Sequence, residues 1–169
     1  DLPTSQILYP CMQCADIFFL KADVCQLGLD QRKVNMLARD YCTDPVKPVI
    51  LSHHMLMGMK KGQEKMSKSD PMSAIFMEDS AKDVEKKIKA AYCVEKEIAD
   101  NPVIDYVRYI IFPAFNDEWT FTLRDGDNKK DVTYRSYAQF EADYVSGLIH
   151  PSDLKPAVTA AINKLIQPV

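Results

Sequence analysis

Five residues in the middle of the chain, Lys65-Met66-Ser67-Lys68-Ser69, combine two positive charges with two hydroxyl groups. Two ammonium groups three residues apart can flank a triphosphate as mobile point charges, and the serine hydroxyls add hydrogen-bond donors. Gly58 and Gly62 upstream give the backbone of this stretch conformational freedom. The pattern is not a Walker loop, because the spaced glycines that precede the lysine of such a loop are absent. The alternative interpretation is a solvated basic loop.

Tyr9, Gln13 and Asp16 form a second polar set, spaced so that they share one face of a helix. Spacing alone favours a polar stripe on an exposed helix. The stripe lies among methionine, alanine and phenylalanine residues, however, so its exposure is not obvious. A short polar run, Gly28-Leu29-Asp30-Gln31-Arg32-Lys33, follows downstream.

A third set, His150-Pro151-Ser152-Asp153-Leu154-Lys155, lies near the C-terminus. Ser152 or Asp153 after a proline turn is typical of a helix start. The chain also contains Cys11-x-x-Cys14, which could indicate zinc or redox chemistry. A lone pair of cysteines without a second pair is weak support for a metal site, so both are interpreted as small packing residues.

The elements that must position the first residues alternate between helix and strand. This order predicts half of a doubly wound α/β sheet. The expected elements are a helix over residues 6–19 starting near Pro10, a strand over 22–25 ended by Gly28, an amphipathic helix over 31–41 with Val34, Leu37, Ala38 and Tyr41 on its apolar face, and a strand over 48–52 that is buried throughout.

The second half of the chain has a different character. After the polar loop over residues 57–71, Ser80 is expected to cap a helix, with Asp83 as its acidic partner. The further elements expected are a buried helix over 103–111, a hairpin of 119–123 and 131–135 around the turn Asp125-Gly126-Asp127-Asn128, and helices over 137–145 and 152–165. A domain boundary is predicted near residue 80, which gives domains 1–79 and 80–169.

The composition of the 169 residues is that of a globular protein, 47% hydrophobic and 27% charged, without an apolar run that would predict a membrane span. Five cysteines without a disulfide-like spacing fit a reducing, cytoplasmic location. The net charge of −3 means that any nucleic-acid contact must depend on local basic patches. The start, Asp1-Leu2-Pro3-Thr4, has neither an initiator methionine nor a signal-peptide pattern, so we expect the chain to be part of a longer protein.

The run from Lys65 to Ser69 matches in full the Lys-Met-Ser-Lys-Ser signature of class I aminoacyl-tRNA synthetases. Tyr-Pro-x-x-Gln-x-x-Asp from Tyr9 to Asp16, then Gly-x-Asp-Gln-Arg-Lys from Gly28, resemble the tyrosine-binding segments of archaeal and eukaryotic tyrosyl-tRNA synthetases. The His-Pro-x-Asp-Leu-Lys run at His150 resembles the anticodon domain of the same family. The tryptophanyl family is disfavoured, because the Asp-Gln-Arg-Lys run is not typical of it.

The resemblance implies a role for each motif. Lys65 and Lys68 would stabilise the departing pyrophosphate in a loop that closes over ATP, with Met66, Ser67 and Ser69 as further ATP contacts. In the tyrosine pocket, Tyr9 and Gln13 would hold the α-amino group, Asp16 would accept the phenol hydrogen bond, Gln31 would reach the substrate from the other side and Asp30 would lie near the ribose.

The choice of tyrosine also has a physical argument. A buried carboxylate at position 16 would penalise any substrate without a hydroxyl, because the carboxylate would then be left unpaired. In the anticodon domain, the resemblance implies that His150 stacks near the first anticodon base and that Asp153 binds its edge. The family places an aromatic residue before two glycines in the preceding hairpin, where this chain has Asn128-Lys129-Lys130. Trp119 either compensates for that aromatic residue or belongs to the core, while Lys129 and Lys130 can contact phosphates.

The expected fold is therefore α/β, the second half of a class I Rossmann-type catalytic domain followed by a mostly helical anticodon-binding domain with a small β-hairpin. The expected activity is ATP-dependent formation of tyrosyl-adenylate and transfer to tRNA(Tyr). Mg²⁺ would arrive with ATP, since no recognisable protein site for a metal is present. A homodimer or a pseudo-dimer is expected.

The family's His-x-Gly-His signature is absent from the chain. We therefore expect the missing N-terminal half to be a partner and the chain alone to be inactive. An incomplete piece, a cleaved chain and a section of a longer protein all fit. The rival interpretation is a non-catalytic, tRNA-binding or structural half of a duplicated synthetase. The intact Tyr9, Gln13, Asp16, Lys65 and Lys68 argue against it, and the residues preceding Asp1 in the gene product would decide.

Overall fold

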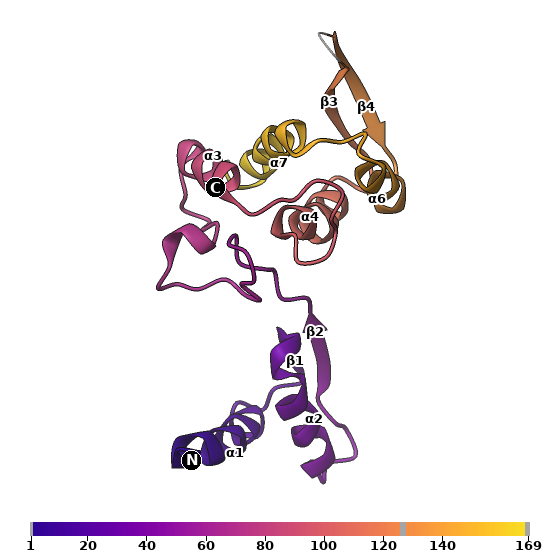
Figure 1. Ribbon diagram of the computed structural model, residues 1–169. Coiled ribbons are helices and arrows are strands. Elements are labelled where there is room, and N and C mark those ends of the chain that lie inside the picture. The colour runs from indigo at the N-terminus through magenta and orange to yellow at the C-terminus, as the bar shows by residue number, and fades with distance from the viewer. Residues whose placement is uncertain (1, 126–127, 168–169) are drawn as a thin grey trace. The chain divides into compact units, whose positions relative to one another are not determined.

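The computed structural model describes residues 2–125 and 128–167 (Figure 1). The chain divides into two compact units, Asp1–Met55 and Leu56–Val169, called here the N-terminal and the C-terminal unit. Each unit has its own hydrophobic core. Within the described residues, no helix is long and apolar enough to cross a membrane.

The N-terminal unit is built around two parallel strands joined by a helix. Its elements are α1 (Thr4–Phe19), β1 (Val24–Gly28), a 3₁₀ turn (Leu29–Gln31), α2 (Arg32–Tyr41) and β2 (Val49–His53). The strands pair in register from Val24 opposite Val49 to Gly28 opposite His53. The predicted order of helix, strand, helix and strand is confirmed, and β1, α2 and β2 form one βαβ unit.

Helix α1 begins at Thr4, so the prediction of a start near Pro10 was wrong. Pro10 lies inside the helix, where it lacks the N–H that would bond to the carbonyl four residues earlier. Its fixed φ is nevertheless compatible with helix, and the backbone of α1 continues on both sides of it. The loss of one backbone hydrogen bond at Pro10 therefore does not prevent the helix from beginning six residues earlier.

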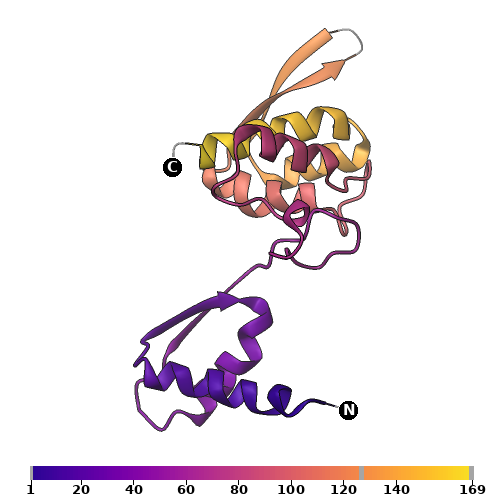
Figure 2. The same cartoon turned by 90° about the vertical axis from the view of Figure 1, so that its left-hand side faces the viewer.

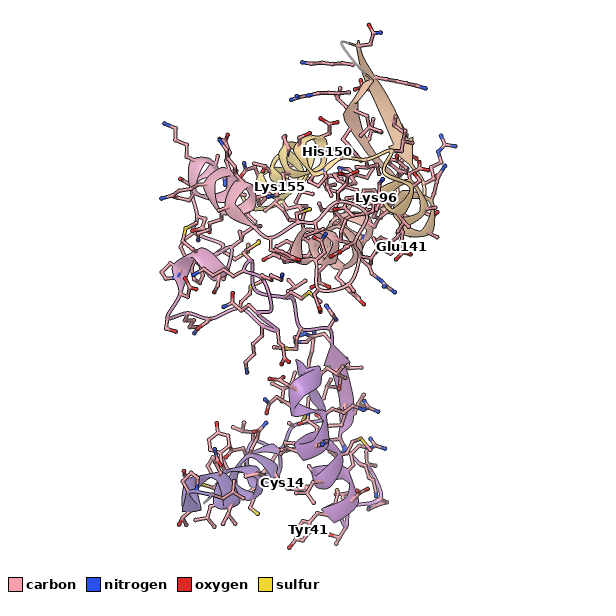
Figure 3. All side chains as sticks on the ribbon, in the orientation of Figure 1. Cys14, Tyr41, Lys96, Glu141, His150 and Lys155 are labelled. Atoms are coloured by element: carbon pink, nitrogen blue, oxygen red, sulfur yellow. The ribbon has the colours of Figure 1, made fainter. Side chains whose placement is uncertain are left out.

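Burial in the N-terminal unit also differs from the prediction. Val49 and Leu51 of β2 remain about half exposed, at 49% and 50%, although the strand was expected to be buried throughout. On α2, Asn35 and Ala38 are buried, whereas Leu37 is 44% and Tyr41 75% exposed. Figure 3 labels Tyr41 at the end of this helix. Two strands and two helices provide too little surface to cover both faces of each element, which explains the small core of the unit.

The C-terminal unit combines helices with one antiparallel hairpin. Figure 2 shows α3 lying along α7. The elements are α3 (Ala81–Ala90), a continuous helical run of α4 (Pro102–Tyr106), a π-helical stretch (Val107–Ile111) and α5 (Phe112–Ala114), then β3 (Trp119–Asp125), β4 (Asn128–Tyr134), α6 (Tyr137–Ser146) and α7 (Pro151–Ile166). The predicted helices and hairpin are confirmed, while the turn residues Gly126 and Asp127 lie outside the described residues.

Aromatic rings fill the core where the hairpin meets the helices. Trp119 is 5% exposed, and its ring contacts Phe112 at 6.2 Å, Phe121 at 4.4 Å and Phe140 at 5.9 Å between centroids. Aromatic pairs at such distances add to the free energy gained by burial. Of the two alternatives for Trp119, the structure supports a core residue.

Residues 56–79, which precede α3, pack with the C-terminal unit. Met59 is 2% exposed within its core, and the backbone N–H of Tyr92 donates to the carbonyl of Met59 at 2.8 Å. The compact units thus divide at residue 55, and the polar loop lies on the C-terminal side of that division. The assignment of residues 56–79 to a catalytic domain remains a prediction about function.

Candidate functional site

In the N-terminal unit, predicted site residues meet just beyond the carboxyl end of a parallel strand. β1 ends at Gly28, and the following 3₁₀ turn carries Asp30 and Gln31. The side chain of Gln13 on α1 donates from Nε2 to Oε1 of Gln31 at 2.9 Å. Ligands of open α/β sheets bind outside the carboxyl ends of the strands, so this pair lies at the expected place.

Gly28 leaves room for two side chains at this edge. A Cβ atom built on it would lie 2.1 Å from Sδ of Met55 and 2.7 Å from Oδ1 of Asp30. Both distances are far below van der Waals contact, so a larger residue would displace the Asp30 carboxylate and the Met55 side chain from these positions. The glycine therefore allows the Asp30 carboxylate to lie against the end of β1.

Tyr9 and Asp16 lie on α1 with Gln13 but are more exposed. Tyr9 is 66% exposed, and Asp16 is exposed as well. The expectation of a buried carboxylate at position 16 is therefore wrong for the chain as it stands. An exposed carboxylate is hydrated, so its discrimination against a substrate without a hydroxyl depends on what closes over it.

The Lys65–Ser69 run forms an irregular loop in the C-terminal unit. Lys65 and Lys68 are exposed, whereas Met66 and Ser67 between them are partly buried. Met66 packs against the core, and its Sδ accepts a hydrogen bond from the Tyr106 hydroxyl at 3.7 Å. The two ammonium groups thus extend from a backbone that is tied to the unit beneath it.

Ser73 holds this backbone from below. Its hydroxyl, in a residue with no exposed surface, accepts from the amide of Ser67 at 3.1 Å and lies 2.7 Å from the carbonyl oxygen of Asp70. The amide of Asp70 donates to the carbonyl of Ser67 at 3.2 Å. The carboxylate of Asp70 pairs with Lys60 at 2.5 Å. The turn that contains Lys68 is therefore closed by several hydrogen bonds.

His150 and Asp153, predicted to bind a base, make structural contacts at the start of α7, where Figure 3 labels His150. Nδ1 of His150 accepts from the amide of Ser152 at 3.1 Å, so the imidazole itself caps the helix. The Asp153 side chain is 8% exposed; it pairs with Nε of Arg124 at 3.2 Å and accepts from the Arg124 amide at 3.3 Å. Asp153 therefore links the hairpin to α7, whereas His150 caps the helix.

The remaining residues that the sequence analysis names are two lysines of the hairpin, the two cysteines of α1 and Lys155. Lys129 and Lys130 lie exposed on β4, and Cys11 is exposed while Cys14 is buried in the small core. Lys155 donates to the carbonyls of Lys89 at 3.0 Å and Ala91 at 2.7 Å, which caps the C-terminal end of α3.

No sequence motif indicates the contacts made by Ser73, Tyr106 and Arg124. Each acts through a contact with a residue at least six positions away, and no local pattern marks such a contact. A buried tyrosine in an apolar helix and a serine after a proline are common, so neither residue type was a signal by itself.

Comparison with known proteins places these features in a family. The family model of class I tRNA synthetases (W and Y) matches residues 1–167. A cytoplasmic tyrosine–tRNA ligase 1 of Arabidopsis thaliana is 59% identical over the whole chain, which spans 44% of that relative.

Two solved structures are also similar. The tyrosyl-tRNA synthetase of Leishmania major, in complex with tyrosinol, is 49% identical with a TM-score of 0.81, and the match covers 97% of this chain and 30% of that one. The Pyrococcus horikoshii enzyme, complexed with L-tyrosine, is 33% identical with a TM-score of 0.86 over 99% of this chain and 52% of that one. The chain belongs to the family of class I tRNA synthetases (W and Y), where it groups with the tyrosyl-tRNA synthetases.

Proposed function

We propose that the chain supplies part of the tyrosine pocket, the ATP loop and the anticodon-reading region of a tyrosine–tRNA ligase. The observation that carries the proposal is the hydrogen bond between Gln13 and Gln31. It joins two motifs, eighteen residues apart, that the resemblance assigns independently to one pocket. That the relatives are named as such ligases supports the same activity.

The proposed tyrosine pocket uses polar groups on α1 and on the turn after β1. Tyr9 and Gln13 hold the α-amino group of the substrate, Gln31 orients Gln13, and Asp16 accepts from the phenol hydroxyl. Asp30 lies near the ribose of the adenylate. The amino group is common to all amino acids, so Asp16 is the residue that distinguishes tyrosine from phenylalanine.

The proposed chemistry is an in-line displacement. A carboxylate oxygen of tyrosine attacks the α-phosphorus of ATP, the bond to the β-phosphate bridging oxygen breaks, and pyrophosphate leaves. Lys65 and Lys68 stabilise the charge that builds on the leaving group, with Met66, Ser67 and Ser69 contacting ATP. Mg²⁺ enters with ATP as part of the substrate. Catalysis is positioning and electrostatic stabilisation without a protein nucleophile.

The tyrosyl group would then pass to tRNA(Tyr), whose anticodon would be read at the start of α7. A carboxylate oxygen has two acceptor positions, so Asp153 can accept from a base while it remains paired with Arg124. His150 would stack on that base, and Lys129 and Lys130 would contact phosphates. We further propose that residues 1–79 act as the catalytic half and residues 80–169 as the anticodon domain, in a cytoplasmic homodimer or pseudo-dimer.

The test is substrate discrimination by Asp16 in the full-length protein. Replacing Asp16 with Ala should lower kcat/KM for tyrosine by the equivalent of roughly 1.5–3 kcal/mol, the value of a hydrogen bond to a charged group. The value for phenylalanine should change much less, so the ratio between the two substrates narrows. Asp40, exposed on α2, provides the matched control as Asp40→Ala, which should leave the ratio unchanged.

Two outcomes would contradict the proposal. An unchanged tyrosine-to-phenylalanine ratio in Asp16→Ala would show that this carboxylate does not read the hydroxyl. A full-length protein that binds tRNA but forms no tyrosyl-adenylate would favour the non-catalytic half of a duplicated synthetase instead.

A further inference from the structure

The Ser73 hydroxyl is buried, and it lies in a short turn just after the loop that contains Lys65 and Lys68. Ser73 has no exposed surface and ends the 3₁₀ turn Pro71–Ser73. Its oxygen accepts from the amide of Ser67 at 3.1 Å. Its single proton faces two carbonyl oxygens, that of Asp70 at 2.7 Å and that of Ser67 at 3.1 Å. By these hydrogen bonds the Ser73 hydroxyl holds together the turn of residues 67–73, which contains Lys68 and begins two residues after Lys65.

The backbone of Ser73 connects this closure to the core. Its amide donates to the carbonyl of Asp70 at 2.9 Å, and its carbonyl accepts from the amide of Met59 at 3.0 Å. Met59 is buried in the core of the C-terminal unit, where its carbonyl accepts from Tyr92. Ser73 is therefore the point at which the loop is joined to a fixed part of the unit.

A second anchor holds the loop on the other side of Ser67. Met66 packs on the core and accepts from the hydroxyl of the buried Tyr106. Ser67 is thus held by Ser73 and its neighbour Met66 by Tyr106, while Lys65 and Lys68 on either side extend outward. Because the backbone between Lys65 and Lys68 is held in this way, the distance between the two residues and the directions in which their side chains leave the backbone are fixed.

We propose that Ser73 is a positioning residue for amino-acid activation, which it serves by fixing the backbone of residues 67–70 so that Lys65 and Lys68 meet the pyrophosphate. This inference rests on the proposed function, because it assigns a role to the two lysines. Ser73 does not touch ATP; it acts on the turn from which the lysines extend. The Lys60–Asp70 ion pair is a weaker restraint on the same turn, since the Lys60 side chain is 57% exposed and its charge is screened by solvent.

The test uses Ser73→Ala in the full-length protein, with Ser73→Cys as a second variant that keeps the volume but weakens the hydrogen bonds. Thr159→Ala is the matched control, since it removes a partly buried hydroxyl that donates to a carbonyl of α7, far along the chain from the loop. We expect Ser73→Ala to slow pre-steady-state tyrosyl-adenylate formation about tenfold, the equivalent of 1.4 kcal/mol in the activation barrier. KM for tyrosine should not change, and Ser73→Cys should fall between the native protein and Ser73→Ala.

A double-mutant comparison separates positioning from a general structural effect. If Ser73 acts through the lysines, Ser73→Ala should cost little further rate in a Lys65→Ala, Lys68→Ala background. Hydrogen exchange of peptides covering residues 65–73 gives a readout that does not depend on activity: exchange should be faster in Ser73→Ala and unchanged in Thr159→Ala.

The outcomes distinguish failure of this inference from failure of the proposed function. If the lysine variants slow activation while Ser73→Ala does not, Ser73 is not a positioning residue and the proposed function stands. If Ser73→Ala is equally harmful with and without the lysines, its role is general stability, and the inference is overturned. If the lysine variants have no effect on activation, the proposed function of the loop is wrong. The role assigned to Ser73 then falls with it, even where exchange at residues 67–70 shows that Ser73 holds the turn.

Discussion

At the scale of single residues, two buried tyrosines in the C-terminal unit differ in what their hydroxyl groups contact. Tyr144 donates to the carbonyl of Val94 at 2.7 Å and accepts from Nδ2 of Asn101 at 3.3 Å. The Tyr134 hydroxyl is buried beside the Asp143 carboxylate, with which it does not reach the geometry of an ordinary hydrogen bond. Burial raises the pKa of both phenols, and the nearby Asp143 carboxylate adds to the rise at Tyr134. The two side chains are equally buried, so they allow a matched comparison.

We predict that Tyr144→Phe destabilises the chain while Tyr134→Phe does not. Removing the Tyr144 hydroxyl leaves the Val94 carbonyl and the Asn101 amide without that partner, which costs about 1–3 kcal/mol. Removing the Tyr134 hydroxyl deletes a buried polar group that has no well-formed hydrogen bond, so stability should be unchanged or slightly higher. Urea denaturation of both variants measures the difference. Equal losses of unfolding free energy would mean that the Tyr144 hydrogen bonds do not stabilise the unit.

The two motifs that the resemblance singled out contain Gln13 and Gln31, and the structure joins these side chains by a hydrogen bond. Their assignment to a tyrosine pocket stays a prediction. Arg124 could not be predicted, because its pairing with Asp153 depends on how a hairpin packs against a helix twenty-nine residues away. The exposure of Asp16 was also unpredictable, since burial depends on what covers α1 and not on its own spacing.

At the scale of elements, the start of α3 is determined by residues that are close together in the sequence. The Ser80 hydroxyl accepts from the amide of Asp83 at 3.3 Å, and the Asp83 carboxylate accepts in return from the amide of Ser80, also at 3.3 Å. This capping box satisfies helix N–H groups that have no partner within the helix. Because such a cap depends on a few neighbouring residues, the sequence predicted Ser80 as the cap and Asp83 as the nearby acid. The start of α1 was predicted wrongly, because the cost of one proline depends on the whole of that helix.

We predict that Ser80→Ala lowers the stability of the C-terminal unit by about 1 kcal/mol, as is typical for loss of an N-cap. The Ser80 hydroxyl and amide hold the pKa of Asp83 below its ordinary value. A lowered carboxyl pKa in the folded state adds stability above the unfolded pKa of about 3.9, and that stability is lost as pH falls through the folded value.

The measurement is thermal unfolding of the native chain and Ser80→Ala between neutral pH and pH 2. The difference in Tm should be largest at neutral pH and should shrink in acid, as Asp83 becomes protonated in both states. Ser146→Ala, at the end of α6 and away from α3, serves as the control. A Tm difference that grows as the pH falls would contradict the capping role of the ionised Asp83.

At the scale of the whole molecule, the N-terminal unit carries much exposed apolar surface. Ile7 is 61%, Met12 63%, Phe19 83% and Leu20 71% exposed on or beside α1. Large apolar side chains exposed in this number on one helix indicate a surface that binds another segment, and the relatives are longer than this chain, which spans 44% of the Arabidopsis one. The proposed tyrosine pocket uses residues of the same helix. A segment that covers the apolar surface of α1 would therefore also help to complete the pocket.

We therefore predict that residues 1–169 alone show no tyrosine-dependent exchange of pyrophosphate into ATP. In the proposed mechanism Lys65 and Lys68 stabilise the leaving group, but the sequence has no His-x-Gly-His run, which by the resemblance would hold ATP from the other side. Addition of the N-terminal half of the synthetase, expressed separately, should restore exchange if it covers the apolar surface of α1. Phe19→Asp, which places a charge on that surface, should weaken the restoration, whereas Asp40→Lys on the exposed side of α2 should not. Strong exchange by the isolated chain would show that its own residues suffice for activation, and the proposed division of the ATP site would then be wrong.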